Sequence, residues 1–182
     1  MNKFAIAALL SIFVTSHALA ASGGTADDEG TIHVGVKLGP SDVTGSPIGF
    51  GVYGGYTLFG PNTIKNHAFF SKLSFAVEGE YVNLGNSSSG GLSYNAATLG
   101  GVAAATYPIN ERFSVIVKAG MASVTGKISG CGGGWCNASS TSIGLHTAAA
   151  GHFNITPKIG VRAGYDSYPS YRMMSASGVF KF

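Results

Sequence analysis

The only two cysteines of the chain lie close together, in the run Cys131-Gly-Gly-Gly-Trp-Cys136. In an oxidising compartment such a pair forms a disulfide, which here would stabilise the folded state by about 2 kcal/mol in the chain-entropy view. A metal site needs more ligands than two thiolates, and no histidine stands nearby. We therefore predict a loop closed by a disulfide, with Trp135, the single tryptophan, exposed as a contact residue. The alternatives for Trp135 are an anchor at the membrane interface or a loop residue without a specific role.

The histidines are the second group that could do chemistry. An enzyme that hydrolyses or transfers acyl chains needs a histidine beside a serine and a carboxylate, on a surface open to lipid. His146 with Ser142 comes nearest to this requirement, but no Ser-His-carboxylate grouping is legible in the sequence. We expect His33, His146 and His152 to form hydrogen bonds in an interior, and we predict no catalytic residue, no metal ligand and no cofactor.

Charged side chains in the middle of alternating segments form the third group. They are Lys37, Glu78, Glu80, Lys118, Arg162 and Lys181. All occupy the phase opposite to the aromatic and β-branched side chains, so they would face water in a soluble barrel and the interior in a membrane barrel. Because buried charges have to pair, the second alternative predicts an interior network that closes the barrel to ions. Otherwise the charges sit near the rims, in water, and contribute little.

Eight segments with period-two alternation carry these residues. We predict strands at Thr31–Leu38, Ile48–Leu58, Ser71–Leu84, Ser93–Tyr107, Arg112–Thr125, Thr141–Phe153, Lys158–Tyr165 and Met173–Phe182. The phase of the fourth is ambiguous because it is rich in Ala and Gly; we place Leu99 outward. The expected fold is an eight-stranded antiparallel up-and-down transmembrane β-barrel over residues 31–182.

The connections between these segments differ in length. Short turns are expected at Pro108–Glu111 and Asn154–Pro157, where Pro and Asn favour tight turns. Longer outer links are expected at Gly39–Pro47, Gly85–Leu92, Gly126–Ser140 and Asp166–Arg172. Such alternation of short and long connections is typical of outer-membrane barrels. Phe59–Phe70 departs from it, because this connection is long where a short turn is expected.

Composition favours a membrane barrel. Charged residues make up 10% of the 182 residues, against about 25% in an average soluble domain. No segment of the mature chain approaches the roughly 18 consecutive apolar residues of a spanning helix. The 28 glycines argue against helices and suit tight turns and close backbone approach. A net charge of +3 without any basic run excludes nucleic acid as an expected partner.

The first residues have the features of a secretory signal peptide. Lys3 supplies a positive charge, Phe4–Val14 is apolar, and small residues follow at Ala18 and Ala20. The apolar run is too short for the alternative, a membrane anchor. We predict a signal peptide over residues 1–20 and a flexible lead-in over residues 21–30.

Several runs resemble the small OmpA-like and OmpX-like outer-membrane β-barrel family. They are Gly49–Tyr56, Phe75–Gly85, Tyr107–Phe113, Val117–Gly120, Phe153–Lys158, Arg162–Asp166 and Gly178–Phe182. The resemblance covers residues 31–182 and implies an eight-stranded barrel delivered by the secretory and barrel-assembly machineries, with Phe182 as part of the assembly signal. Because no periplasmic domain follows the barrel here, we expect no peptidoglycan binding.

Together these features predict a non-enzymatic protein of the bacterial outer membrane. It would support membrane integrity or take part in adhesion or protection through its extracellular loops. Expected partners are outer-membrane lipid and lipopolysaccharide, the barrel-assembly machinery and a host or surface ligand at the loops, and a monomer is expected. The main alternative is a lipid A-modifying enzyme; a small pore and a soluble ligand-carrying barrel are weaker ones.

Overall fold

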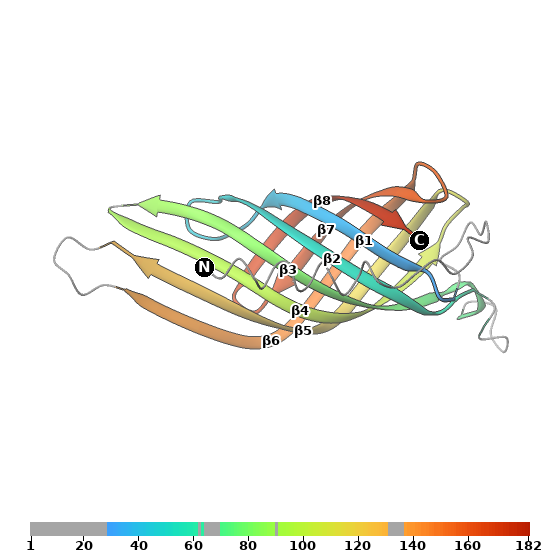
Figure 1. The fold of residues 1–182 in the computed structure, drawn as a ribbon, viewed down its shortest axis with the longest axis horizontal. Helices are drawn as coiled ribbons and strands as arrows, with labels where there is room; N and C mark the ends of the chain where they lie inside the picture. Colours follow the sequence, from blue (N-terminus) through green and yellow to red (C-terminus); the bar gives the residue numbers. More distant parts are fainter. Residues whose placement is uncertain (1–28, 62, 64–69, 90, 131–136) are drawn as a thin grey trace.

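The computed structural model describes residues 29–61, 63, 70–89, 91–130 and 137–182, which form a closed antiparallel barrel of eight strands. The strands are β1 (Ile32–Pro40), β2 (Ile48–Phe59), β3 (Ser74–Ser89), β4 (Leu92–Pro108), β5 (Phe113–Ser129), β6 (Ala138–Asn154), β7 (Ile159–Tyr168) and β8 (Tyr171–Lys181). Each strand pairs with its neighbours in sequence, and β8 pairs with β1 (Figure 1). The predicted fold class is confirmed.

Closure by the last strand leaves the spanning sheet without an open edge. The ladder between β1 and β8 runs from His33 opposite Lys181 to Leu38 opposite Ala176. The backbone N–H of Phe182 also donates to the carbonyl oxygen of Ile32 at 2.8 Å. Because hydrocarbon offers no water to unpaired backbone groups, this closure lets the strands cross a membrane.

The apolar phase of every strand faces outward. Phe50 is 57% exposed and Met121 is 55% exposed, whereas Glu78 and Glu80, on the opposite phase, are each only 4% exposed. The same outward orientation is found for Val36, Leu38, Val52, Leu99, Val117, Leu145, Val161, Met174 and Phe180. Apolar residues therefore cover the outside and charges fill the inside, which excludes the soluble barrel. The outward placement of Leu99 on β4 is confirmed.

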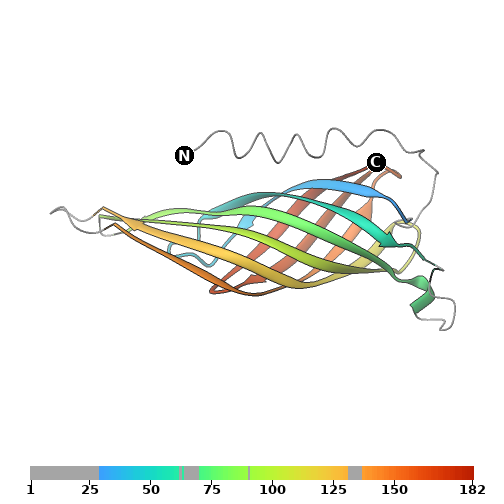
Figure 2. The same cartoon turned by 60° about the horizontal axis from the view of Figure 1, so that its bottom comes forward.

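The barrel wall is uneven in height. Strands β3 to β6 have 16 or 17 residues each, while β1, β7 and β8 have 9 to 11. The extra length projects at the end opposite the C-terminus, on the left of Figure 1 and again in Figure 2. A spanning strand needs about 9 to 11 residues, so the outer parts of β3 to β6 extend beyond the hydrocarbon. We call this part the projecting wall.

Three predicted outer links are wrong in their extent. Residues 85–89 continue β3, and β4 already begins at Leu92. The link at 126–140 is shorter than predicted, because β5 continues to Ser129 and β6 begins at Ala138. The third predicted link, Asp166–Arg172, contains only the turn residues Pro169 and Ser170, and Ser170 has φ 75°. The Ser-, Gly- and Asn-rich composition indicated loops, but a paired neighbouring strand holds such residues in a sheet.

A β-bulge marks the base of the projecting wall on β3. The register with β4 shifts between Asn83 and Gly85, and the Asn83 side chain accepts a hydrogen bond from the Gly85 N–H at 2.8 Å. Gly85 has φ +103°, a conformation that glycine adopts without steric cost. The bulge changes the alternation of β3 above this point.

The connection after β2 contains the short 3-10 helix η1 (Phe70–Lys72), which delays the start of β3 to Ser74 instead of the predicted Ser71. In Figure 2 this helix lies at the same end of the barrel as the C-terminus. No helix among the described residues is long and apolar enough to cross a membrane.

An apolar layer lies in the interior on the side of the projecting wall. Its members are Val43, Val82, Leu84, Ala96, Ala122, Val124, Tyr168 and Met173. Val43 belongs to the β1–β2 connection, and hydrogen bonds join this connection to β8, the strand that neighbours β1. The N–H of Asp42 donates to the Arg172 carbonyl at 3.0 Å, and the Asp42 carboxylate accepts from the Arg172 N–H at 2.7 Å. The connection thus places the Val43 side chain in the interior, where it packs within the apolar layer.

Candidate functional site

Glu78 on β3 is the centre of the first of two interior ion clusters. Its Oε1 atom lies 2.9 Å from His33 Nε2 and accepts a hydrogen bond from the Arg162 guanidinium at 3.0 Å. Its Oε2 atom accepts from the Lys118 ammonium. The strands β1, β3, β5 and β7 each contribute one of these residues, so the cluster ties together positions that are distant in the chain.

Tyr53 on β2 covers this first cluster. The Lys118 ammonium lies 5.0 Å and the Arg162 guanidinium 5.2 Å from the centroid of its ring, within the range of cation–π attraction. The Tyr53 hydroxyl donates to the Ser177 hydroxyl at 3.2 Å. A single aromatic ring therefore packs against both cations that neutralise Glu78.

Lys37 is the centre of the second cluster. Its ammonium donates to Glu80 at 2.8 Å, to Asp166 at 3.2 Å and to the Tyr168 hydroxyl at 2.8 Å. Asp166 accepts a further hydrogen bond from the Ser175 hydroxyl at 3.0 Å. All three donor positions of the ammonium are thus used by interior acceptors.

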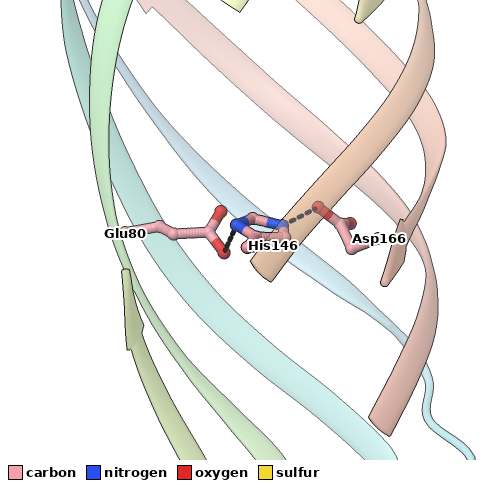
Figure 3. A group of neighbouring side chains, drawn as sticks. All are labelled: Glu80, His146 and Asp166. Atoms are coloured by element: carbon pink, nitrogen blue, oxygen red, sulfur yellow. Dashed lines mark ion pairs between the residues drawn. The ribbon is translucent and has the colours of Figure 1, made fainter. Parts of the chain in front are cut away.

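His146 on β6 lies between the two carboxylates of the second cluster, as Figure 3 shows. Its Nδ1 atom is 3.6 Å from Glu80 and its Nε2 atom is 3.5 Å from Asp166, beyond hydrogen-bond range. The ring is fully buried and stacks on Tyr168 with a centroid distance of 4.4 Å. Packing against an aromatic ring, rather than close hydrogen bonds, holds this histidine in place.

Glu80, His146 and Asp166 form a donor set that could be considered for a metal ion, since their ligand atoms lie within 4.8 Å of one another. The residues do not fit a divalent cation. The ammonium of Lys37 already bridges Glu80 and Asp166, and the two ring nitrogens of His146 face opposite carboxylates. A dication would also add two charges where cations and carboxylates are balanced. We therefore assign the local positive charge to Lys37.

The same residues do not assemble a nucleophile. A catalytic triad places the histidine between the nucleophilic hydroxyl and a carboxylate. Here Ser175 binds Asp166 instead of His146, and Ser142 is exposed on the projecting wall while His146 is fully buried. The buried cluster has the geometry of a structural network, without the exposed hydroxyl that acyl transfer requires.

The two clusters are electrically balanced. Their ion pairs join three cations, Lys37, Lys118 and Arg162, to three carboxylates, Glu78, Glu80 and Asp166. These three positive and three negative charges cancel. Because an unpaired charge in a poorly solvated interior is costly, this balance makes a filled polar interior tolerable.

Five of the six charges selected from the sequence meet in these clusters. The sixth, Lys181, donates to the Asn154 side chain at 3.0 Å instead, at the end of the barrel where the C-terminus lies. Asp166 was predicted to lie just past the end of the seventh strand, although it shares the phase of Arg162. Because β7 continues to Tyr168, Asp166 faces the interior as a full member.

Other predicted residues lie elsewhere. Cys131, Cys136 and Trp135 are outside the described residues, so their bridge and display remain predictions. The signal peptide over residues 1–20 and most of the lead-in are outside them too. Phe182 is 63% exposed, and its ring lies 4.8 Å from that of Phe180, which places the proposed assembly signal on the outer surface.

An apolar exterior around a neutralised charged interior defines an integral outer-membrane β-barrel protein. The chain belongs to the family described as outer membrane protein beta-barrel domain, which matches residues 5–177. It is a protein of the bacterial outer membrane, and the family resemblance seen in the sequence is confirmed.

Solved structures of small outer-membrane barrels share the fold. Ail, the attachment invasion locus protein of Yersinia pestis, is 19% identical with a TM-score of 0.57, covering 85% of this chain and 99% of that one. Neisserial surface protein A is 17% identical with a TM-score of 0.55, covering 90% and 100%. The N-terminal barrel of Pseudomonas aeruginosa OprF is 12% identical with a TM-score of 0.59, covering 85% and 98%. A search of curated protein sequences gives no match.

Proposed function

We propose that this protein is a non-enzymatic outer-membrane barrel with a closed interior, whose extracellular end makes contacts at the cell surface. The observation that carries the proposal is the filled lumen. Two balanced ion clusters occupy the middle of the barrel, and the apolar layer that includes Val43 and Met173 lies above them. The filled interior stabilises the folded barrel and leaves no open channel. Contacts with other molecules would therefore be made at the extracellular end.

The projecting wall supports the surface role. Its outward residues change from apolar to polar along one strand, as in β5, where Ser123 and Thr125 follow Met121. Thr125 and Thr141 lie side by side on β5 and β6 with their hydroxyls 3.1 Å apart. This part of the sheet is suited to the aqueous layer outside the hydrocarbon, where lipopolysaccharide and host or surface ligands are the proposed partners.

The proposal includes two further elements that follow from the predicted class. The barrel-assembly machinery would insert the chain, with Phe182, which directly follows β8, as part of the signal. The protein would act as a monomer, because the ladder between β1 and β8 already closes the sheet. Lipid A modification is the rival activity. The burial of His146, while Ser142 is exposed, argues against it.

Planar-bilayer recording tests the closed interior. The purified protein should give no stable single-barrel conductance, and a variant that empties part of the apolar layer, Met173→Ala, reports whether this layer contributes to the seal. A reproducible conductance from the unaltered protein would overturn the closed interior.

Whole-cell adhesion tests the surface role. Because Gly126 pairs with Ser140 across β5 and β6, residues 127–139 can be replaced by an Asn-Gly turn without changing the register below. Cells that carry the shortened protein should bind immobilised epithelial cells less than cells with the full wall, at equal surface amounts. Equal binding by both would contradict the role of the wall. Lipid A from the same strains, compared by mass spectrometry with a deletion strain, should be unchanged, since a difference would favour the enzyme.

A further inference from the structure

A concave site opens on the extracellular side of the barrel, between the projecting wall and the β1–β2 connection. We call it the extracellular cup. Its volume is about 290 Å³. The lining comes from five segments of the barrel: Val43, Thr44, Tyr94, Asn95, Ala96, Gly126, Lys127, Ile128, Ala138, Ser139, Ser140 and Tyr171.

The cup lies above the hydrocarbon. Gly126, in its lining, directly follows Thr125, which is outward-facing and polar, whereas the apolar outward residues of β5 end at Met121. The membrane-facing part of the sheet is therefore below the cup. An occupant would come from the aqueous, sugar-rich layer outside the bilayer, and the acyl chains of the membrane do not reach it.

The floor of the cup is buried, and a glycine in the lining leaves the space above the floor open. Val43 is 4% and Ala96 is 1% exposed, so both are fixed in the apolar layer. A Cβ at Gly126 would lie 3.5 Å from the Tyr171 hydroxyl, which means that any longer side chain would enter the cup. The cavity is thus already formed in the folded protein, as is usual for small-molecule sites.

The lining combines aromatic rings with hydroxyl and amide groups. Tyr94 and Tyr171 are half-buried and offer an apolar ring with a polar end, and the structure gives neither hydroxyl a partner among the described residues. Thr44, Ser139 and Ser140 add exposed hydroxyls. Tyr, Ser, Gly and Asn together are also the composition of antibody recognition loops, where tyrosine supplies rigid contact area and the small polar residues supply hydrogen bonds.

The charge of the lining narrows the ligand class. Among the described residues that line the cup, Lys127 is the one cation and none carries a carboxylate. Phosphate-rich ligands are recognised by clusters of cations, and a purely apolar ligand would leave the hydroxyls without partners. A pyranose ring has both an apolar C–H face for a tyrosine and hydroxyl groups for Ser, Thr and Asn.

We propose that the extracellular cup binds a neutral saccharide unit, which stacks on Tyr94 or Tyr171 and hydrogen-bonds to the hydroxyl groups of the rim. The inference rests on the proposed surface function and names the ligand chemistry for it. Such a unit could belong to the lipopolysaccharide of the same cell or to glycans of another cell, since both present neutral hexoses above a membrane.

Ligand-observed saturation-transfer NMR on the full protein in lauryldimethylamine oxide micelles tests the proposal, because this detergent carries no sugar. The probes are methyl glycosides of glucose, galactose, mannose and N-acetylglucosamine. Two further probes separate the sources: lipid-free core oligosaccharide represents the lipopolysaccharide of the same cell, and lactose represents the glycans of another cell. Gly126→Leu fills the cup and Tyr94→Ala removes one ring. Val117→Ala, on the lipid-facing side of β5, the strand of Gly126, is the matched control. Circular dichroism verifies the barrel of each variant.

We expect at least one probe to bind the unaltered protein and Val117→Ala equally. Gly126→Leu should lose binding, and Tyr94→Ala should weaken it by up to about tenfold, the equivalent of one aromatic contact. The proposal is overturned if no probe binds, or if a folded Gly126→Leu variant binds as well as the unaltered protein. If adhesion depends on the projecting wall but no saccharide binds, the proposed surface function is retained and only the saccharide site is rejected.

Discussion

Replacing Glu78 by glutamine is the sharpest test of the interior. The substitution keeps the shape of the side chain and removes one charge from a group that is 4% exposed. It leaves the guanidinium of Arg162, 3.0 Å away, and the ammonium of Lys118 facing a neutral amide. Tyr53 offers these cations only its ring face, at 5.0 and 5.2 Å. The balanced interior would then carry one uncompensated positive charge.

The expected loss of folding free energy is about 3 to 5 kcal/mol, the usual result of removing one partner of a buried ion pair. Glu111→Gln is the matched control, because Glu111 is exposed in the β4–β5 turn. That control should change the stability by about 0.5 kcal/mol or less. The difference between two chemically identical substitutions isolates the effect of burial.

Equilibrium unfolding in urea, with the barrel in phosphatidylcholine vesicles and followed by circular dichroism, measures both values. The double variant Glu78→Gln with Arg162→Gln restores neutrality, so its loss should be smaller than the sum of the single losses by about 0.5 to 3 kcal/mol. A Glu78→Gln loss below about 1 kcal/mol, or strictly additive losses, would refute the claim that the network is buried and coupled. Solvated rim charges would behave in that way.

Three further outcomes follow from the same structure. Gly55→Ala should lower the free energy of unfolding in urea by about 1 to 3 kcal/mol, because the added Cβ would lie 2.7 Å from both Glu78 and the His33 ring. Gly101→Ala should leave it nearly unchanged, because nothing lies within 4 Å of a Cβ there. Val117→Arg on the lipid face should cost about 2 to 4 kcal/mol and Thr125→Arg above the hydrocarbon at most about 1 kcal/mol; equal losses would contradict the placement of the bilayer. The unreduced, denatured protein should take up no maleimide at Cys131 and Cys136, and labelling without reductant would exclude the predicted disulfide.

The barrel could be predicted from the sequence because a membrane barrel requires one pattern above all. Along each strand, the residues that face lipid must be apolar, and charged residues must face the interior. A charge on the lipid side is costly, so the charged side chains in the middle of the strands are confined to the interior phase. Lys37 and Val36 are neighbours in the chain, yet one is 3% and the other 58% exposed.

The ends of the strands could not be predicted in the same way. Alternation between apolar and polar residues disappears where both faces of the sheet meet water, as happens above Thr125 on β5 and above Thr141 on β6. Residues there keep a strand conformation because of their neighbours, for example Ser139 opposite Lys127. The same limit affects Asp166: its phase matches that of Arg162, but a strand expected to end at Tyr165 left it outside the predicted charge network.

The glycines carry information that turn propensity does not contain. Gly35 and Gly55 lie within β1 and β2, on the interior phase, and not in turns. A side chain at Gly55 would collide with Glu78 and His33, and one at Gly35 would collide with Tyr53. A narrow eight-stranded barrel has just enough interior space for its side chains, so large charged and aromatic groups require glycines opposite them. Gly35 and Gly55 therefore leave the space that the Tyr53, His33 and Glu78 side chains occupy. The ion network depends on these two residues although they have no side chain.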